Sequence, residues 1–103
     1  MKHQILAAVT ALTLMASANF AFAAGDAAAG KRKAATCAGC HGAKGISATP
    51  MYPNLAGQKA AYIAKQLKAF KDGTRVEPTM KAMTAALSDE DMANLGAYYE
   101  GMK

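Results

Sequence analysis

The chain has 103 residues, with 12 Lys or Arg against 7 Asp or Glu, and its formal net charge is +5. This length suits a single domain. The basic residues are scattered and no aromatic residues are interleaved with them, so we expect no nucleic-acid partner.

Residues 1–23 are predicted to be a signal peptide that is cleaved off. Lys2 and His3 precede an apolar run over residues 5–18, and Ala21-Phe22-Ala23 supplies the small residues of a signal-peptidase site. An apolar run of roughly 14 residues is short for a bilayer span, so we expect no membrane anchor. The sequence therefore predicts secretion with cleavage after Ala23, and one domain over residues 24–103.

Removal of this segment would leave His41 as the only histidine and a net charge of about +4. A domain of this size lies near the limit at which an apolar core alone gives adequate stability. We therefore expect a disulfide, a metal or a buried cofactor to contribute to folding.

Residues 24–37 are predicted to form the first helix. The segment is rich in Ala, and Asp26 is suited to cap its N-terminus. Over residues 39–57 the helical pattern lapses, and glycines and prolines punctuate a long loop. A loop of this length in a small domain is usually functional or wrapped around a ligand.

A second helix is predicted over residues 58–72, where an apolar stripe follows the helical period and Gly73 can end the helix. A second loop follows from residue 74 to about residue 79. The last helix begins after Ser88, because Ser88 and Asp91 form a capping-box pattern. No segment alternates with the period of a strand for long enough to predict one. The sequence therefore predicts an all-α fold of three or four helices with two substantial loops.

Both cysteines and His41 lie within the stretch CAGCHG. A redox disulfide is one interpretation, but thioredoxin-like CxxC sites belong to βαβ scaffolds. A structural zinc site is another, but it needs four ligands, and residues 24–103 offer only three cysteines and histidines. Covalent haem fits better, because two thiols add to the vinyl groups and the adjacent histidine binds iron. The pattern predicts one covalently bound haem c, with thioethers at Cys37 and Cys40 and with His41 as the proximal iron ligand.

Elimination narrows the candidates for the second axial ligand of the haem iron. No other histidine follows residue 23, which leaves a Met, a Lys or an open position. Met92 and Met102 fall on the apolar stripe of the last helix and are expected to pack in the core, while Met51 is expected at a wall or at the surface. Met80 and Met83 lie in the second loop region, far enough along the chain to return over the opposite haem face. The residues alone predict that one of this pair binds iron and the other packs.

An ordered set of motifs extends over residues 24–103. In chain order they are GDAAAGK, CAGCHG, YPNLAGQ, YIAKQLKAFKDGTR, TMKAM, LSDED and LGAYY. This set resembles the class I cytochromes c, and especially the small bacterial periplasmic monohaem type that is similar to one half of the dihaem cytochromes c. The resemblance implies the class I cytochrome c fold, with three to four helices wrapped around one covalently bound haem.

The same resemblance implies roles for individual residues. Pro53 matches the family proline whose carbonyl accepts the Nδ1–H of the proximal histidine. The family's axial Met precedes the capping Ser of the last helix by eight residues, which implies Met80 as the ligand and leaves Met83 as the alternative. Gly30 would lie where the first and last helices cross, admitting an aromatic side chain, Tyr98. Candidates for haem-side or propionate contacts are Tyr62, Gln66 and Arg75.

A haem with both axial positions filled performs outer-sphere electron transfer, because no substrate reaches the iron. We therefore expect a monomeric carrier, not an enzyme, that shuttles single electrons between respiratory redox partners. Its positive charge is expected to steer it to an acidic docking surface on a membrane-bound reductase or oxidase. The lysines that can frame the haem edge are Lys31, Lys33, Lys44, Lys59 and Lys81.

Two other functions are compatible with the same motif. The first is an open-site haem protein that binds a gas or acts like a peroxidase, and it would lack the Met ligand. The absence of a distal histidine argues against peroxide chemistry. The second is a haem-binding subunit or domain that is dedicated to a larger enzyme complex.

Overall fold

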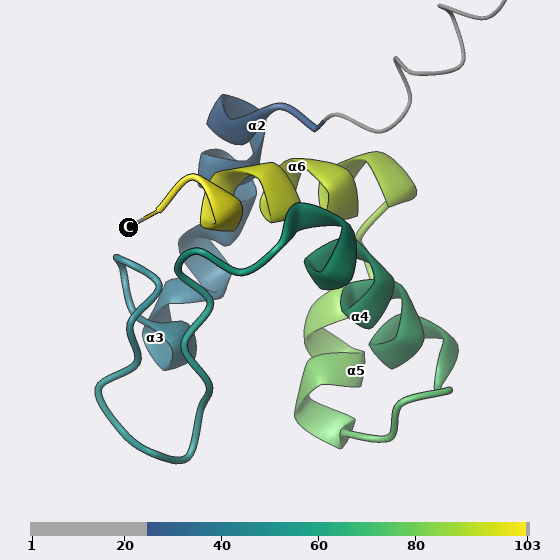
Figure 1. Cartoon of the computed structure of the whole chain (residues 1–103). Helices are drawn as coiled ribbons and strands as arrows, with labels where there is room; N and C mark the ends of the chain where they lie inside the picture. The colour runs from purple at the N-terminus through teal and green to yellow at the C-terminus, as the bar shows by residue number, and fades with distance from the viewer. Residues whose placement is uncertain (1–24, 103) are drawn as a thin grey trace, which may run out of the picture.

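Every regular element in residues 25–102 is a helix. The computed structural model describes these residues, and the predicted signal peptide with its cleavage site after Ala23 lies outside them. The elements, drawn in Figure 1, are α2 (Ala27–Lys33), the 3₁₀ helix η2 (Ala34–Thr36), α3 (Ala38–His41), α4 (Ala60–Asp72), α5 (Pro78–Thr84) and α6 (Asp89–Glu100). The all-α prediction is therefore confirmed over the described part of the chain.

The first predicted helix, over residues 24–37, is divided into two short elements, α2 and η2. Asp26 caps α2 as predicted, with its Oδ1 accepting the N–H groups of Ala28 and Ala29. The helix does not continue to residue 37, because the Cys37 N–H donates to the Ala34 carbonyl (2.9 Å) and so tightens the chain into η2. A separate turn, α3, then carries the chain to His41, and the long loop begins after it.

Helix α5 corrects the prediction of a loop around Met80 and Met83. Pro78 occupies the first turn, where a missing N–H has no intrahelical partner to lose. The carboxylate of Glu77 accepts the Met80 N–H (2.7 Å) and caps the helix. Both methionines therefore lie on a helix, which sets their spacing on its surface.

Helix α6 is the element against which both α2 and α4 pack, while α5 packs against α4. Asn94 on α6 accepts the N–H of Asp26 at the start of α2 (2.7 Å), and Glu100 accepts the N–H of Ala60 at the start of α4 (2.8 Å). These side chains satisfy N–H groups that a helix start leaves free. The buried residues Ala34, Ile63, Leu95 and Tyr99 form the core between these helices.

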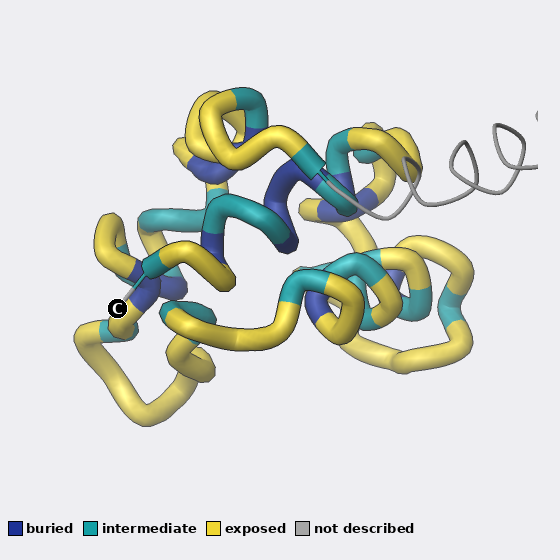
Figure 2. Tube along the Cα trace, turned by 45° about the horizontal axis from the view of Figure 1, so that its top comes forward, coloured by how far each residue is buried: buried dark blue, intermediate teal, exposed yellow. Residues whose placement is uncertain are grey.

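The burial of the chain differs between helices and loop. Figure 2 shows buried stretches along the helices and a mainly exposed connection between α3 and α4.

The helices α2 and α6 cross at Gly30, where a Cβ atom would overlap the carbonyl oxygen of Asn94. Tyr98 is the next neighbour, with its Cβ at 2.9 Å from that position. The resemblance implied Tyr98 as the contact, and the structure adds the Asn94 backbone as the tighter one.

Candidate functional site

The two thiols and the imidazole lie on one turn of backbone. Cys37 precedes α3, and its carbonyl accepts the N–H groups of both Cys40 (3.3 Å) and His41 (3.0 Å). Both cysteines are free thiols and partly buried. This turn therefore presents two thiols to one ligand, with a histidine directly beside the second thiol.

Gly42 ends this turn, and its backbone conformation directs the following loop away from α3. Its φ is +89°, a conformation that glycine adopts without steric cost, and a Cβ atom here would overlap the Ile46 carbonyl. The loop then returns, because the N–H groups of Leu55 and Ala56 both donate to the Gly45 carbonyl (2.8 and 3.0 Å). These bonds bring the YPNL segment back to His41.

His41 is held in one tautomer by this returning loop. Its side chain is buried, with only 8% of its surface exposed, and its Nδ1 lies 2.8 Å from the carbonyl oxygen of Pro53. A carbonyl only accepts, so Nδ1 carries the proton and donates it. The lone pair of Nε2 is then available to a metal, as a histidine ligand requires.

Cys37 packs against the core from the other side of the turn. Burial raises the pKa of the Cys37 thiol, and it also raises the pKa of Tyr99. The thiol is therefore neutral at physiological pH and sits in an apolar environment. A porphyrin attached at this sulfur would extend the apolar core.

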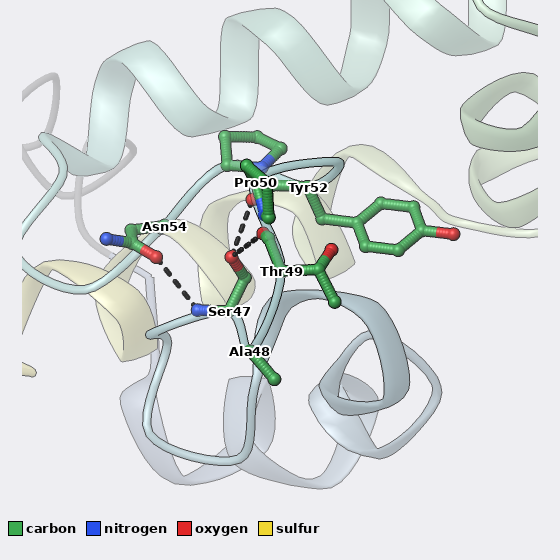
Figure 3. Close-up of a pocket in the computed structure, with 7 residues that line it drawn as sticks. Ser47, Ala48, Thr49, Pro50, Tyr52 and Asn54 are labelled. Atoms are coloured by element: carbon green, nitrogen blue, oxygen red, sulfur yellow. Dashed lines mark hydrogen bonds between the residues drawn. The ribbon is translucent and has the colours of Figure 1, made fainter.

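The loop after His41 is organised around Ser47, as Figure 3 shows. Ser47 donates its hydroxyl toward the carbonyls of Tyr52 (2.6 Å) and Thr49 (2.8 Å), and its N–H donates to Asn54 Oδ1 (2.8 Å). The same loop residues line a shallow polar hollow at the surface. The ring of Tyr52 stands edge-on to the imidazole of His41, with 6.4 Å between the ring centroids.

The predicted axial residues lie on different elements. His41 ends α3 and Met80 lies on α5, and Figure 1 shows α3 and α5 at opposite sides of the molecule, on the same side of α6. Met80 is partly buried, whereas Met83 is 42% exposed. The Met80 carbonyl accepts from the hydroxyl of Thr84 (2.8 Å), which lies one turn later on α5 and is buried.

Two of the three predicted haem-side contacts are brought together. Arg75 donates from Nη1 to Gln66 Oε1 (2.8 Å), and its guanidinium lies over the ring of Phe70, 4.5 Å from the centroid. Tyr62 lies one turn earlier on α4 and is half exposed. A cation and an amide therefore meet at the surface between α4 and the loop before α5.

The segments that carry the predicted ligands also expose large apolar side chains. Exposed apolar side chains beside a proposed site are suited to contact an apolar ligand. A porphyrin is a flat apolar group with two anionic propionates, so both the apolar side chains and the Arg75–Gln66 pair suit it. These exposed residues are Ile46, Met51, Tyr52, Tyr62, Val76 and Met83.

No three His, Cys, Asp or Glu side chains converge within residues 25–102. A haem would be held here by the two thiols and by Nε2 of His41, which lie on one turn. The residues present fit a covalent haem.

Ser47 and Asn54 are the site residues that the sequence analysis did not single out. Asn54 belongs to the YPNLAGQ motif, but Ser47 stands in a Gly- and Pro-punctuated loop with no spacing that marks it. The preference of Ser and Asn for turns through side-chain hydrogen bonds is the one signal that pointed to them. Their partners lie up to seven residues away and depend on the path of the loop.

Comparison with known proteins gives one family. The model of the family described as "Cytochrome c" matches residues 27–103. Cytochrome c4 of Pseudomonas aeruginosa is 45% identical over 95 residues, which cover 92% of this chain and 47% of that protein. Cytochrome c-554(548) of Halomonas halodenitrificans is 47% identical over 83 residues, covering 78% of this chain and 100% of that protein. The chain thus spans about half the length of the cytochrome c4 relative and matches the whole of the second one.

A third relative and a solved structure extend the comparison. A thiosulfate dehydrogenase electron acceptor of Stutzerimonas stutzeri is 46% identical over 70 residues, covering 67% of this chain and 32% of that protein. The structure of Acidithiobacillus ferrooxidans cytochrome c4 superposes with a TM-score of 0.72 at 32% identity, over 77% of this chain and 51% of that chain. Sequence and structure therefore point to the same group of proteins.

Proposed function

The chain belongs to the cytochrome c family with the class I fold, and from this premise we propose that it is an electron-transfer protein rather than an enzyme. The family implies a covalently bound haem c, and Cys37 and Cys40 fit its CxxCH attachment motif. When bound, the haem iron supplies a one-electron couple. The chain would carry single electrons between redox proteins through this group.

In this proposal, Cys37 and Cys40 form the two thioethers and His41 binds the iron through Nε2. The observation that supports it best is the hydrogen bond from His41 Nδ1 to the Pro53 carbonyl (2.8 Å), on the same turn that presents both thiols. The bond leaves Nε2 as the free donor atom and increases its basicity.

Met80 is proposed as the second axial ligand, with Met83 as the alternative. Met80 is the less exposed of the two, and its carbonyl is bonded to the buried Thr84. A thioether ligand favours the reduced iron and completes its coordination, so the site binds no substrate. Tyr62, Gln66 and Arg75 are proposed to contact the haem or its propionates, and the Arg75–Gln66 bond supports this role for two of them.

We expect Met80→Ala to abolish the near-infrared sulfur-to-iron band of the oxidised protein and to let the ferrous iron bind carbon monoxide. Met83→Ala is the matched control, because it truncates a methionine on the same helix and should keep both properties. The opposite pattern would assign the ligand to Met83. Rapid carbon monoxide binding to the unaltered ferrous protein would instead support an open-site haem protein.

The proposed place of action is the periplasm, and the proposed partners are redox proteins with acidic docking surfaces. No helix in residues 25–102 has the length and apolarity to cross a membrane. The exposed lysines Lys31, Lys44, Lys59 and Lys81 keep the net charge positive, while Lys33 forms an ion pair with Asp91 (3.5 Å). Steering by such charges speeds encounter at low salt. We propose that the protein acts there as a monomer.

One comparison favours a second candidate function. The relative named as a thiosulfate dehydrogenase electron acceptor favours the alternative that this chain is a haem-binding subunit dedicated to one enzyme complex. Reduction rates with several purified dehydrogenases separate the two candidates. Comparable rates with unrelated donors favour the diffusing carrier, and reduction by one donor alone favours the dedicated acceptor.

A further inference from the structure

Pro53 is flanked by two groups that both bind Ser47. The carbonyl of Tyr52, on the N-terminal side of Pro53, accepts from the Ser47 hydroxyl at 2.6 Å. The side chain of Asn54, on the C-terminal side, accepts from the Ser47 N–H at 2.8 Å. Figure 3 shows dashed bonds that meet at Ser47, one of them from the side chain of Asn54.

Pro53 itself offers little to hold its carbonyl in place. A proline has no N–H to bond, and its ring fixes φ but leaves ψ, which sets the carbonyl direction, to the neighbouring peptides. Both of those neighbours are tied to the same residue across the loop. The direction of the Pro53 carbonyl therefore depends on Ser47.

We propose that Ser47 is a positioning residue that aims the Pro53 carbonyl at His41 Nδ1, and so sets the orientation and basicity of the proximal imidazole. This inference rests on the proposed role of His41 as an iron ligand. A group that accepts the other ring N–H of a metal-binding histidine orients the ring and raises the donor strength of the metal-binding nitrogen. Ser47 acts one step further out, through the carbonyl that His41 binds.

The competing explanation is that Ser47 only keeps the loop folded. Thr49 provides the control for this, because its hydroxyl accepts the Met51 N–H (3.1 Å) in the same loop but bonds neither neighbour of Pro53. Thr49→Val removes one hydroxyl from the loop without loosening the two flanks of Pro53. Ser47→Thr keeps the hydroxyl and should rescue the effect of Ser47→Ala.

The test uses the haem-loaded protein and two measurements on it. The first is the solvent exchange rate of the His41 Nδ1–H in the ferrous protein by NMR, which reports directly on the bond to Pro53. The second is the midpoint potential from an optical redox titration. For Ser47→Ala we expect exchange about fivefold faster, the factor for losing one ordinary hydrogen bond, and a more positive potential. The weaker bond makes the imidazole a poorer donor, which stabilises ferric iron less.

The expected controls are wild-type values for Ser47→Thr and Thr49→Val. Wild-type exchange and potential in Ser47→Ala would overturn the inference, and so would an equal change in Thr49→Val. If Ser47→Ala does not load haem, Asn54→Ala loosens the other flank and should show the same two changes, while unchanged values there would overturn the inference. Absence of covalent haem from the unaltered protein would refute the proposed function instead.

Discussion

Gly30 controls how closely α2 and α6 approach each other. The carbonyl of Asn94 occupies the space where a Cβ atom of residue 30 would lie, and Tyr98 is packed beside it. The same Asn94 bonds the Asp26 N–H through its side chain (2.7 Å), so this crossing also anchors the start of α2. Backbone atoms form the contact, and they have little freedom to move aside.

We expect Gly30→Ala to lower the free energy of unfolding by about 2 kcal/mol, because overpacking at a backbone contact outweighs the gain in helix propensity. Gly101→Ala is the control, since a Cβ there would meet only ordinary contacts, the nearest at 3.5 Å. Denaturant titration of the two haem-loaded variants measures both changes. If Gly30→Ala and Gly101→Ala are equally stable, the two helices can move apart at this crossing at no cost in free energy.

The first turn of α6 combines a cap with a titratable group. Ser88 Oγ accepts the Asp91 N–H (3.0 Å), and the Asp91 carboxylate accepts the Ser88 N–H (3.0 Å). This reciprocal pair confirms the predicted capping box. The bond from the Ser88 backbone, assisted by Lys33, holds the pKa of Asp91 below its usual value of 3.8.

The depressed pKa of Asp91 predicts a pH-dependent contribution of this cap. A carboxylate with a lowered folded-state pKa stabilises the fold above the unfolded-state value, and the contribution is lost as the pH falls through the folded-state pKa. We expect Asp91→Ala to lower the melting temperature by a few degrees at neutral pH. The difference from the wild type should shrink when the pH falls below 3.8.

Glu90→Ala serves as the matched control for Asp91→Ala, because Glu90 is an exposed acid in the same turn. Thermal melts of both variants across the acidic range provide the comparison. A loss for Asp91→Ala that stays constant with pH would show that the charge of the carboxylate makes no contribution to the cap.

Taken as a whole molecule, the chain has a small core of its own. The buried apolar residues in residues 25–102 are Ala34, Ile63, Phe70, Met92, Leu95 and Tyr99. A domain of this size buries too little apolar surface for comfortable stability and usually relies on an additional element. A covalent haem placed against the exposed apolar side chains of the loop, α4 and α5 would be that element.

We expect the double variant Cys37→Ala/Cys40→Ala, purified without haem, to lose cooperative thermal unfolding and to show weak near-ultraviolet circular dichroism. Alanine preserves the helix propensity of α3, so the loss would come from the missing haem and its packing. Glu90→Ala changes an exposed residue outside the proposed haem contacts and should keep the cooperative transition. A cooperative melt of the haem-free variant near the wild-type temperature would contradict this.

Local features were predictable because each depends on residues within about one helical turn. The caps at Asp26 and at Ser88–Asp91 and the left-handed stop at Gly73 occur in the structure as the sequence indicated. The turn that ends at His41 is equally local, so the spacing of the CxxCH motif was enough to bring two thiols and an imidazole together. The family of the chain followed from such motifs in their order.

Contacts between distant segments were decided only by the tertiary structure. The Asn94 backbone against Gly30, the Glu100 cap on α4 and the Arg75–Gln66 bond depend on how the helices cross and where their loops return. The cap of α5 by Glu77 is local, but the packing of α5 on α4 is a contact between distant segments that the sequence did not indicate. The sequence analysis missed Ser47 because its role depends on the path of the loop around Pro53, and no spacing or motif in the sequence indicates that path.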